Sequence, residues 1–215
     1  MAGSTIRCCS KFSRTTASAP RSCAPTRSCK MVPARSVVLA GIKHCGKTTL
    51  GRLLARHWGV PFLDTDAELE AEFAVRHKRS AGFRDIYREL GEEGFRRLEA
   101  EVIDALADGG GVRVIALGGG VVANPFLSPD ALRKLGFGVW LDLKPEIAYP
   151  RILRRGLPPF LAGSADPEAE FRRICREREP KFRAFAELPF GIETEEPAET
   201  VAERLASAIE KEYSK

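Results

Sequence analysis

The residue types best suited to chemistry stand together in the segment Gly41-Ile-Lys-His-Cys-Gly46-Lys47-Thr48. This segment fills every fixed position of the pattern G-x-x-x-x-G-K-[ST], which is typical of phosphate-binding loops. In such a loop, backbone N–H groups and a helix N-terminus hold phosphate oxygens, the lysine reaches the β- and γ-phosphates, and the hydroxyl binds Mg²⁺. The pattern therefore predicts a nucleotide site with Lys47 on the phosphates and Thr48 on the metal.

A pair of carboxylates, Asp64 and Asp66, follows the next short apolar run, residues 60–63. Ligands of open α/β sheets bind at the carboxyl ends of the strands, so this pair is well placed to meet Mg²⁺ or a substrate hydroxyl. The structural alternative is that Asp66 caps a helix that begins at Ala67. Asp64 gains nothing from that cap, and we therefore favour a functional role for the pair.

A possible anion site lies further along the chain. Arg96 and Glu99 stand three residues apart in a segment with helical spacing, residues 85–108, so they share a face. The carboxylate can hold the guanidinium in one rotamer for anion binding, although an ordinary solvated pair is the simpler interpretation of the spacing alone. The triple glycine at 118–120 ends the apolar run 112–117 and offers either bare backbone to a ligand or a flexible turn.

These residues need a scaffold, and the apolar pattern predicts strands that alternate with helices. The expected strands are residues 36–40, 60–63, 112–117, 138–143 and 190–194. The expected helices are residues 49–57, 85–108, 145–154, 166–185 and 197–213, with another from Ala67. This alternation implies an α/β fold with a five-stranded, mainly parallel sheet and helices on both faces. Asp142, in the fourth expected strand, is the second choice for an acidic Mg²⁺ partner.

A segment after the helix at 145–154 is too broken for helix or sheet. Its glycines and prolines are Gly156, Pro158, Pro159, Gly163 and Pro167. Such a segment suits a mobile lid that closes over bound ligands and excludes water.

Residues 1–35 differ in composition from the rest of the chain. They hold seven of the 34 Lys and Arg residues and none of the 29 acidic ones, so residues 36–215 carry 27 basic and 29 acidic groups. A basic nucleic-acid surface is therefore not expected on the body. We predict a disordered basic extension, residues 1–35, and a single domain, residues 36–215. The extension is either a transit peptide, which would direct the protein to a plastid, or lies before a true start at Met31, which would leave the protein in the cytoplasm.

The sequence of residues 36–215 predicts neither a membrane-spanning helix nor a disulfide bond. The longest apolar runs, residues 112–117 and 139–143, are far shorter than the roughly 20 residues that a membrane helix needs. Cys45 and Cys175 are its only cysteines and lie far apart without metal spacing. We expect unpaired thiols and a reducing compartment.

Taken in order, these motifs resemble the shikimate kinase family over roughly residues 36–212. The phosphate-binding loop is followed by that family's D-[ST]-D segment at 64–66. Residues 86–99 match its signature I-F-x-x-x-G-E-x-x-F-R-x-x-E, with Tyr87 in place of Phe, and residues 178–182 resemble R-x-P-x-Y, with Phe182 in place of Tyr. The G-E-x-x-F-R-x-x-E part is the specific one, since a phosphate-binding loop alone would not separate this family from other small kinases.

The resemblance implies a P-loop kinase fold and the ATP-dependent phosphorylation of the 3-hydroxyl of shikimate. It implies ATP contacts at Gly41, Cys45, Gly46, Lys47, Thr48, Thr49 and Arg151, the last near the adenine. It implies shikimate contacts at Asp66, Arg96, Gly118, Gly119, Gly120 and Arg178. Mg²⁺ falls to Thr48 and, through water, Asp64, while Lys47 and Asp66 take the catalytic roles. We expect a monomer that binds neither nucleic acid nor membrane.

Two departures from the family pattern bear on activity. The lid element R-P-L-L aligns with residues 158–161, so Pro158 stands where the family has its lid arginine, and Arg154 or Arg155 would have to replace it. Lys43, His44 and Cys45 stand in the phosphate-binding loop where the family favours small residues, and we expect His44 to be an exposed bystander. The alternatives are a kinase for another hydroxy acid, such as gluconate, or a ligand-binding relative that has lost turnover with its lid arginine.

Overall fold

The structure is a computed structural model that describes residues 32–214, apart from the side chains of Arg155, Pro159 and Phe160. Residues 1–31 of the basic extension, and the predictions made for them, therefore lie outside the described residues, as does the proposed role of the Arg155 side chain. Residues 32–35 are described, and Nη2 of Arg35 donates to Oε2 of Glu187 at 2.7 Å. Among residues 32–214, no helix is long and apolar enough to cross a membrane.

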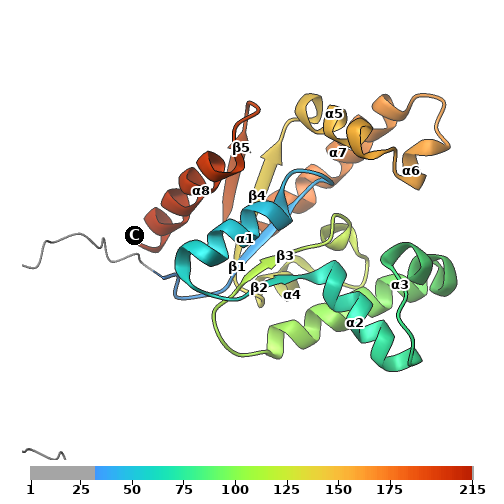
Figure 1. The fold of residues 1–215 in the computed structure, drawn as a ribbon, viewed down its shortest axis with the longest axis horizontal. Helices are drawn as coiled ribbons and strands as arrows, with labels where there is room; N and C mark the ends of the chain where they lie inside the picture. Colours follow the sequence, from blue (N-terminus) through green and yellow to red (C-terminus); the bar gives the residue numbers. More distant parts are fainter. Residues whose placement is uncertain (1–31, 215) are drawn as a thin grey trace, which may run out of the picture. The chain divides into compact units, whose positions relative to one another are not determined.

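The described body is built on a five-stranded sheet in the order β2-β3-β1-β4-β5, and all four strand pairs are parallel (Figure 1). The strands are β1 (Val37–Gly41), β2 (Phe62–Asp64), β3 (Val114–Ala116), β4 (Phe137–Leu143) and β5 (Leu188–Ile192). Every residue of the central strand β1 is buried, as expected for a parallel strand that is covered on both faces. The predicted parallel α/β sheet is confirmed.

Helices cover both faces of this sheet (Figure 1). They are α1 (Lys47–Trp58), α2 (Thr65–His77), α3 (Phe83–Asp108), α4 (Pro129–Arg133), α5 (Pro145–Arg155), α6 (Pro159–Ala162), α7 (Pro167–Phe185) and α8 (Ala198–Tyr213), with a 3₁₀ turn η1 (Val121–Ala123). Helices α1 and α8 pack together on one face, where α1 approaches Leu39. Helix α7 covers the other face, where Phe182 stacks on Trp140 of β4.

Helices α2 and α3 form a smaller core of their own beside β2 and β3. Its buried members are Leu69, Phe73, Ile86, Phe95, Leu98 and Val102. The predicted continuous helix at 85–108 is wrong in one respect, because α3 is interrupted at Gly91, whose φ of 68° and ψ of 178° are not helical. Glycine adopts this left-handed φ without steric cost. The break puts a kink between the two parts of α3.

Two further expectations need correction. The lid segment was expected to contain neither helix nor strand, but it includes the short helix α6, whose first residue is Pro159. Proline suits the first position of a helix for two reasons. Its φ is fixed at a helical value, and the N–H that it lacks would have no hydrogen-bond partner within the helix at that position. The last strand covers 188–192 rather than 190–194. Pro189 made its start hard to recognise, yet an edge strand such as β5 tolerates proline.

Candidate active site

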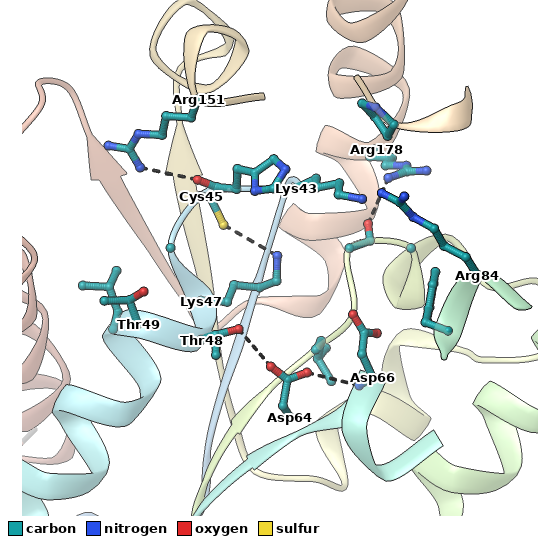
Figure 2. A pocket seen from close by; sticks show the side chains of 18 of the residues that line it. Lys43, Cys45, Lys47, Thr48, Thr49, Asp64, Asp66, Arg84, Arg151 and Arg178 are labelled. Carbon is teal, nitrogen blue, oxygen red and sulfur yellow. Dashed lines mark hydrogen bonds between the residues drawn. The ribbon is translucent and has the colours of Figure 1, made fainter. Parts of the chain in front are cut away.

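A pocket of about 1670 Å³ lies at the carboxyl ends of β1, β2 and β3. Parallel strands place the loops that follow them at one edge of the sheet, which is where α/β proteins bind ligands. The pocket is lined by the loop after β1, the two aspartates after β2, the triple glycine after β3, and side chains from α3, α5 and α7 (Figure 2). The sequence motifs therefore meet at one site.

The phosphate-binding loop is folded around its own lysine. The Nζ of Lys47 donates to the carbonyl oxygens of Gly41 and Ile42 at 2.9 and 3.1 Å. A Cβ on Gly41 would lie 2.7 Å from the Sγ of the buried Cys45, so only glycine fits there. Gly46 precedes α1 with a φ of 99°, which glycine adopts readily. Cys45 and both glycines thus shape a loop whose backbone can surround an anion.

A hydroxyl and a carboxylate meet beside this loop. The Oγ1 of Thr48 donates to Oδ2 of Asp64 at 2.8 Å, and Oδ1 of Asp64 accepts from the backbone N–H of Asp66 at 3.2 Å. Helix α2 thus begins at Thr65 with Asp64 as its cap. The structural alternative, in which Asp66 caps a helix that begins at Ala67, is therefore wrong. The statement that Asp64 gains nothing from capping is also wrong, because Asp64 itself caps α2 and leaves the Asp66 side chain available.

The oxygen atoms of Thr48 and Asp64 suit Mg²⁺. This ion prefers hard oxygen ligands and is usually held by one or two protein groups, with phosphates and water completing its octahedron. Within residues 32–214, no group of three or more His, Cys, Asp or Glu side chains is arranged to hold a metal by itself. The donor set therefore fits a cation that arrives with a nucleotide.

The carboxylate of Asp66 lies in the pocket between the phosphate-binding loop and the end of β3 (Figure 2). Burial and then the negative charge of Asp64 raise the pKa of Asp66 to about 6, although Lys47 opposes the shift. A Cβ on Gly118 would lie 2.4 Å from Oδ1 of Asp66. The N–H of Gly118 donates to Oγ1 of Thr65 at 2.8 Å, which fixes the strand end against α2. Asp66 is thus a confined carboxylate that can accept a proton near neutral pH.

Arg96 and Glu99 form a buried, hydrogen-bonded pair. Their side chains are 18% and 6% exposed, and Nη1 of Arg96 donates to Oε2 of Glu99 at 2.9 Å. The Nδ2 of Asn124 donates to the same Oε2 at 2.9 Å and to the carbonyl oxygen of Arg96 at 2.8 Å. An ordinary solvated pair is therefore the wrong interpretation. No sequence motif pointed to Asn124, which lies 25 positions beyond Glu99.

The triple glycine lies between two arginines. A Cβ on Gly120 would come within 2.8 Å of Nη1 of Arg96, and Nη1 of Arg178 donates to the carbonyl oxygen of Gly119 at 2.9 Å. Burial and then the charge of Arg96 lower the pKa of Arg178. Two guanidinium groups thus face the pocket from α3 and α7, an arrangement that can hold a planar carboxylate.

The far end of the pocket is formed by α5 and by the loop after β5. Arg151 donates through Nε and Nη2 to Glu195 at 3.0 and 2.6 Å, and through Nη1 to the carbonyl oxygen of His44 at 3.4 Å. His44 is half-buried with a φ of 64°, so the expectation that it is exposed is wrong. Thr49 is exposed on α1 and also lines the pocket.

Comparison with known proteins shows to which family this chain belongs. A family model described as shikimate kinase matches residues 43–210. The chain belongs to the shikimate kinase family. It is 40% identical over 170 residues to a shikimate kinase of Symbiobacterium thermophilum, covering 78% of this chain and 92% of that one. It is 39% identical over 177 residues to a shikimate kinase of Thermobifida fusca, covering 80% and 95%.

Solved structures confirm the fold of the family. A shikimate kinase from Acinetobacter baumannii in complex with shikimate superposes with a TM-score of 0.72 at 30% identity, covering 86% of this chain and 97% of that one. A shikimate kinase from Bacteroides thetaiotaomicron gives a TM-score of 0.66 at 27% identity, covering 82% and 98%. The predicted P-loop kinase fold is therefore that of the shikimate kinases.

Three residues singled out in the sequence for the lid or the metal site also have defined positions in the structure. Asp142 does not line the pocket, and burial followed by the charge of Glu179 raises its pKa. Pro158 lines the pocket at the expected lid position. Arg154 also lines it, but its side chain is 70% exposed and its Nη2 lies 3.4 Å from Oε1 of Glu195.

Two further cations in the pocket were not predicted as functional. Lys43 was noted only as an unusual residue for the shikimate kinase loop, and Arg84 belongs to no motif. The structure places both among the residues that line the pocket. The signal available for Lys43 was a charged residue at a loop position where the family resemblance implies a small one.

Proposed function

We propose that this chain transfers the γ-phosphoryl group of ATP to the 3-hydroxyl of shikimate, giving ADP and shikimate 3-phosphate. The observation that carries the proposal is that the buried Arg96–Glu99 pair, Arg178 and Asp66 share one pocket with the phosphate-binding loop. The loop provides for a nucleotide, and the paired arginines provide for a small acid.

The nucleotide end would be served by residues of the loop, α1 and α5. Gly41, Cys45 and Gly46 present backbone N–H groups to the phosphates, and Lys47 exchanges its two carbonyl acceptors for β- and γ-phosphate oxygens. Thr49 and Arg151 lie toward the nucleoside, where the guanidinium, already fixed by Glu195, can lie against the base. Thr48 would hold Mg²⁺, with Asp64 acting through a water molecule. Mg²⁺ supplies neutralisation of phosphate charge when it is bound.

The acceptor end would be served by α2, α3, α7 and the triple glycine. The carboxylate of shikimate binds between Arg96 and Arg178, and the absence of side chains at Gly118, Gly119 and Gly120 lets the ring approach the backbone closely. Asp66 then accepts a hydrogen bond from the 3-hydroxyl and orients its oxygen toward the γ-phosphorus.

The chemical step would form one bond and break another. The 3-oxygen attacks the γ-phosphorus, the bond from that phosphorus to the β,γ-bridging oxygen breaks, and ADP leaves with the electron pair. The hydroxyl proton passes to Asp66, whose pKa of about 6 leaves it mostly ionised at neutral pH. Loose phosphoryl transfer requires little more than positioning and charge neutralisation.

Cellular and assembly properties remain predictions. We expect a monomeric enzyme whose partners are ATP and shikimate, working in the cytoplasm if translation starts at Met31 and in a plastid if residues 1–35 are a transit peptide. The extent of the catalytic domain, residues 36–215, is a prediction of the same kind.

The test is ADP release by the full chain, with Mg²⁺ and ATP, against a panel of hydroxy acids that includes shikimate and gluconate. Release that depends on shikimate and is much weaker with the other acids is expected. Preference for gluconate would favour a different small-molecule kinase. Tight shikimate binding without turnover would favour the non-catalytic relative that Pro158 suggests.

A further inference from the structure

Two cations in the pocket have no assigned role. Lys43 lies on the phosphate-binding loop and is half-buried, and Arg84 lies exposed at the start of α3. Neither side chain makes a hydrogen bond or a salt bridge with a residue that the structure describes. Of the acids that line the pocket, Asp64 accepts from Thr48 and Glu99 accepts from Arg96, while the charge of Asp66 acts on Lys43. Unpaired like charges in a pocket indicate a place for an anion.

Lys43 stands where the nucleotide and acceptor ends of the pocket meet. Its backbone lies 3.8 to 3.9 Å from the point that a Cβ on Gly119 would occupy, so it packs against the triple glycine. Its side chain extends from the loop across the pocket toward Arg84 (Figure 2). The charges that act on it belong to Arg84, Asp66 and Lys47. These neighbours include both the proposed proton acceptor and the loop lysine.

The position of Lys43 matches the path of the phosphoryl group. That group leaves the side of Lys47 and arrives at the hydroxyl held by Asp66, and negative charge is spread over its three equatorial oxygens during transfer. A cation influenced by both residues lies beside that path. The carboxylate of the acceptor already has two arginine partners. Arg96 is fixed by Glu99, and Arg178 is fixed by the carbonyl oxygen of Gly119.

We propose that Lys43, assisted by Arg84, binds the phosphoryl group during its transfer and in the product. The inference rests on the proposed function. Lys43 would donate N–H hydrogen bonds to equatorial phosphoryl oxygens, and no covalent bond to it forms or breaks. The chain would thereby supply from the phosphate-binding loop and α3 the positive charge that Pro158 cannot supply from the lid.

Arg154 is the competing source of that charge. It approaches Glu195, which also holds Arg151, so it lies toward the nucleoside end rather than beside Asp66. Its side chain is also 70% exposed, whereas Lys43 is half-buried. A half-buried cation interacts more strongly with a developing charge, because less water screens it.

The experiment compares Lys43→Met, Lys43→Arg, Arg84→Met and Arg154→Ala, with Lys211→Met on the exposed surface of α8 as the matched control. Methionine keeps the length of the lysine stem and removes the charge. The readouts are kcat, the KM for shikimate, and calorimetric affinities for shikimate and for shikimate 3-phosphate without nucleotide or metal. Thermal unfolding of each variant checks that it is folded.

We expect Lys43→Met to lower kcat about 10²-fold, the usual size for loss of one group that stabilises transition-state charge. Its affinity for shikimate 3-phosphate should fall about tenfold while its affinity for shikimate changes less than about threefold, since the two ligands differ only in the phosphoryl group. Lys43→Arg should recover most of kcat, Arg84→Met should lower kcat less than Lys43→Met, and Lys211→Met should match the wild type.

Three outcomes would overturn the inference. The first is unchanged kcat and product affinity in Lys43→Met. The second is an equal loss of affinity for shikimate and its phosphate, which would mean that Lys43 binds a group present on the acceptor itself. The third is a larger fall in kcat from Arg154→Ala than from Lys43→Met. If Lys43→Met does not fold, the test rests on Arg84→Met alone. A loss of its affinity for shikimate 3-phosphate that exceeds any loss for shikimate would then support the inference, and the absence of such a selective loss would overturn it. A wild type that cannot phosphorylate shikimate rejects the proposed function instead.

Discussion

At the residue scale, Asp66 combines its proposed catalytic role with an energetic cost. Its carboxylate is confined between α2 and the end of β3, where burial and the charge of Asp64 both oppose ionisation. Because the pKa of the folded state lies above that of the unfolded chain, the folded protein binds a proton more tightly. The contribution of Asp66 to the free energy of unfolding is therefore greatest at acid pH, and it declines as the pH rises from about 4 to about 6.

Replacement of Asp66 by Asn should stabilise the ligand-free protein at neutral pH. A rise in pKa from 3.8 to about 6 corresponds to at most about 3 kcal/mol, and water that reaches the side chain reduces this, so we expect about 1–2 kcal/mol at pH 7. Denaturant unfolding at several pH values, without Mg²⁺ or nucleotide, measures it. The gain should vanish near pH 3.5, and a gain that is the same at every pH would contradict the assignment. Turnover should be nearly abolished.

Glu99 and Glu101 provide a matched pair on one helix. Glu99 is 6% exposed and holds Arg96 in the pocket, whereas Glu101 is 54% exposed and pairs with Arg76 on the surface. Changing Glu99 to Gln should raise the KM for shikimate about tenfold, because the guanidinium loses the charge that fixes its rotamer. Changing Glu101 to Gln should leave it within about twofold. Equal KM values for both variants would show that the buried pair does not position the acceptor.

At the element scale, the loop after β3 sets the distance between the proposed proton acceptor and the proposed anion site. Gly118 faces Asp66, Gly120 faces Arg96, and Gly119 lies between them with its carbonyl oxygen on Arg178. The loop continues through η1 to Asn124, which bonds Glu99 and Arg96. This one short loop thus contacts side chains from α2, α3 and α7 and fixes their positions relative to one another.

Alanine substitutions in this loop should separate binding from stability. A Cβ at residue 120 would press on Nη1 of Arg96 from 2.8 Å, but at residue 119 its nearest neighbour would be 3.8 Å away. Because a guanidinium can move aside, Gly120→Ala should cost little folding stability and yet raise the KM for shikimate about tenfold. Gly119→Ala should have a clearly smaller effect. The check is KM together with Tm, and a large loss of Tm without a change in KM would count against this geometry.

Local patterns predicted some of these elements and not others, for physical reasons. The phosphate-binding loop and the buried strands were recognisable because glycine spacing and apolar runs are local properties of the sequence. The contact from Asn124 to Glu99 depends on how η1 packs against α3, and no local pattern records that. The same holds for Asp64, whose capping role depended on where α2 begins. Arg84 lines the pocket from the start of α3, before the expected helix at 85–108, and it belongs to no motif, so no local pattern placed it there.

At the scale of the whole molecule, the nucleotide and acceptor ends of the pocket rest on different cores. The main core surrounds the sheet, and a smaller one joins α2 to α3. Asp66, Arg84 and Arg96 come from the two helices of the smaller core, while Lys47 and Arg151 come from helices on the main one. Both cores lie within the body that begins after the basic extension, which has no apolar periodicity of its own.

Removal of residues 1–30 should therefore leave the enzyme intact. An acid-free segment without hydrophobic periodicity offers no core contacts, so the Tm and kcat of the shortened chain should equal those of the full chain within error. Parallel thermal unfolding and kinetic assays of the two chains measure this. A clear fall in either quantity would place the extension within the folded domain.

The most direct measurement of the central claim is ³¹P NMR of the full chain incubated with Mg²⁺, ATP and shikimate, beside a Lys47→Ala variant. Our account predicts that ADP and a phosphomonoester on the 3-hydroxyl of shikimate appear in equal amounts. It also predicts that the variant, which is folded but lacks the loop lysine, forms almost none, because transition-state charge is no longer neutralised. Formation of ADP and inorganic phosphate with unaltered shikimate, or equal product formation by Lys47→Ala, would contradict the account.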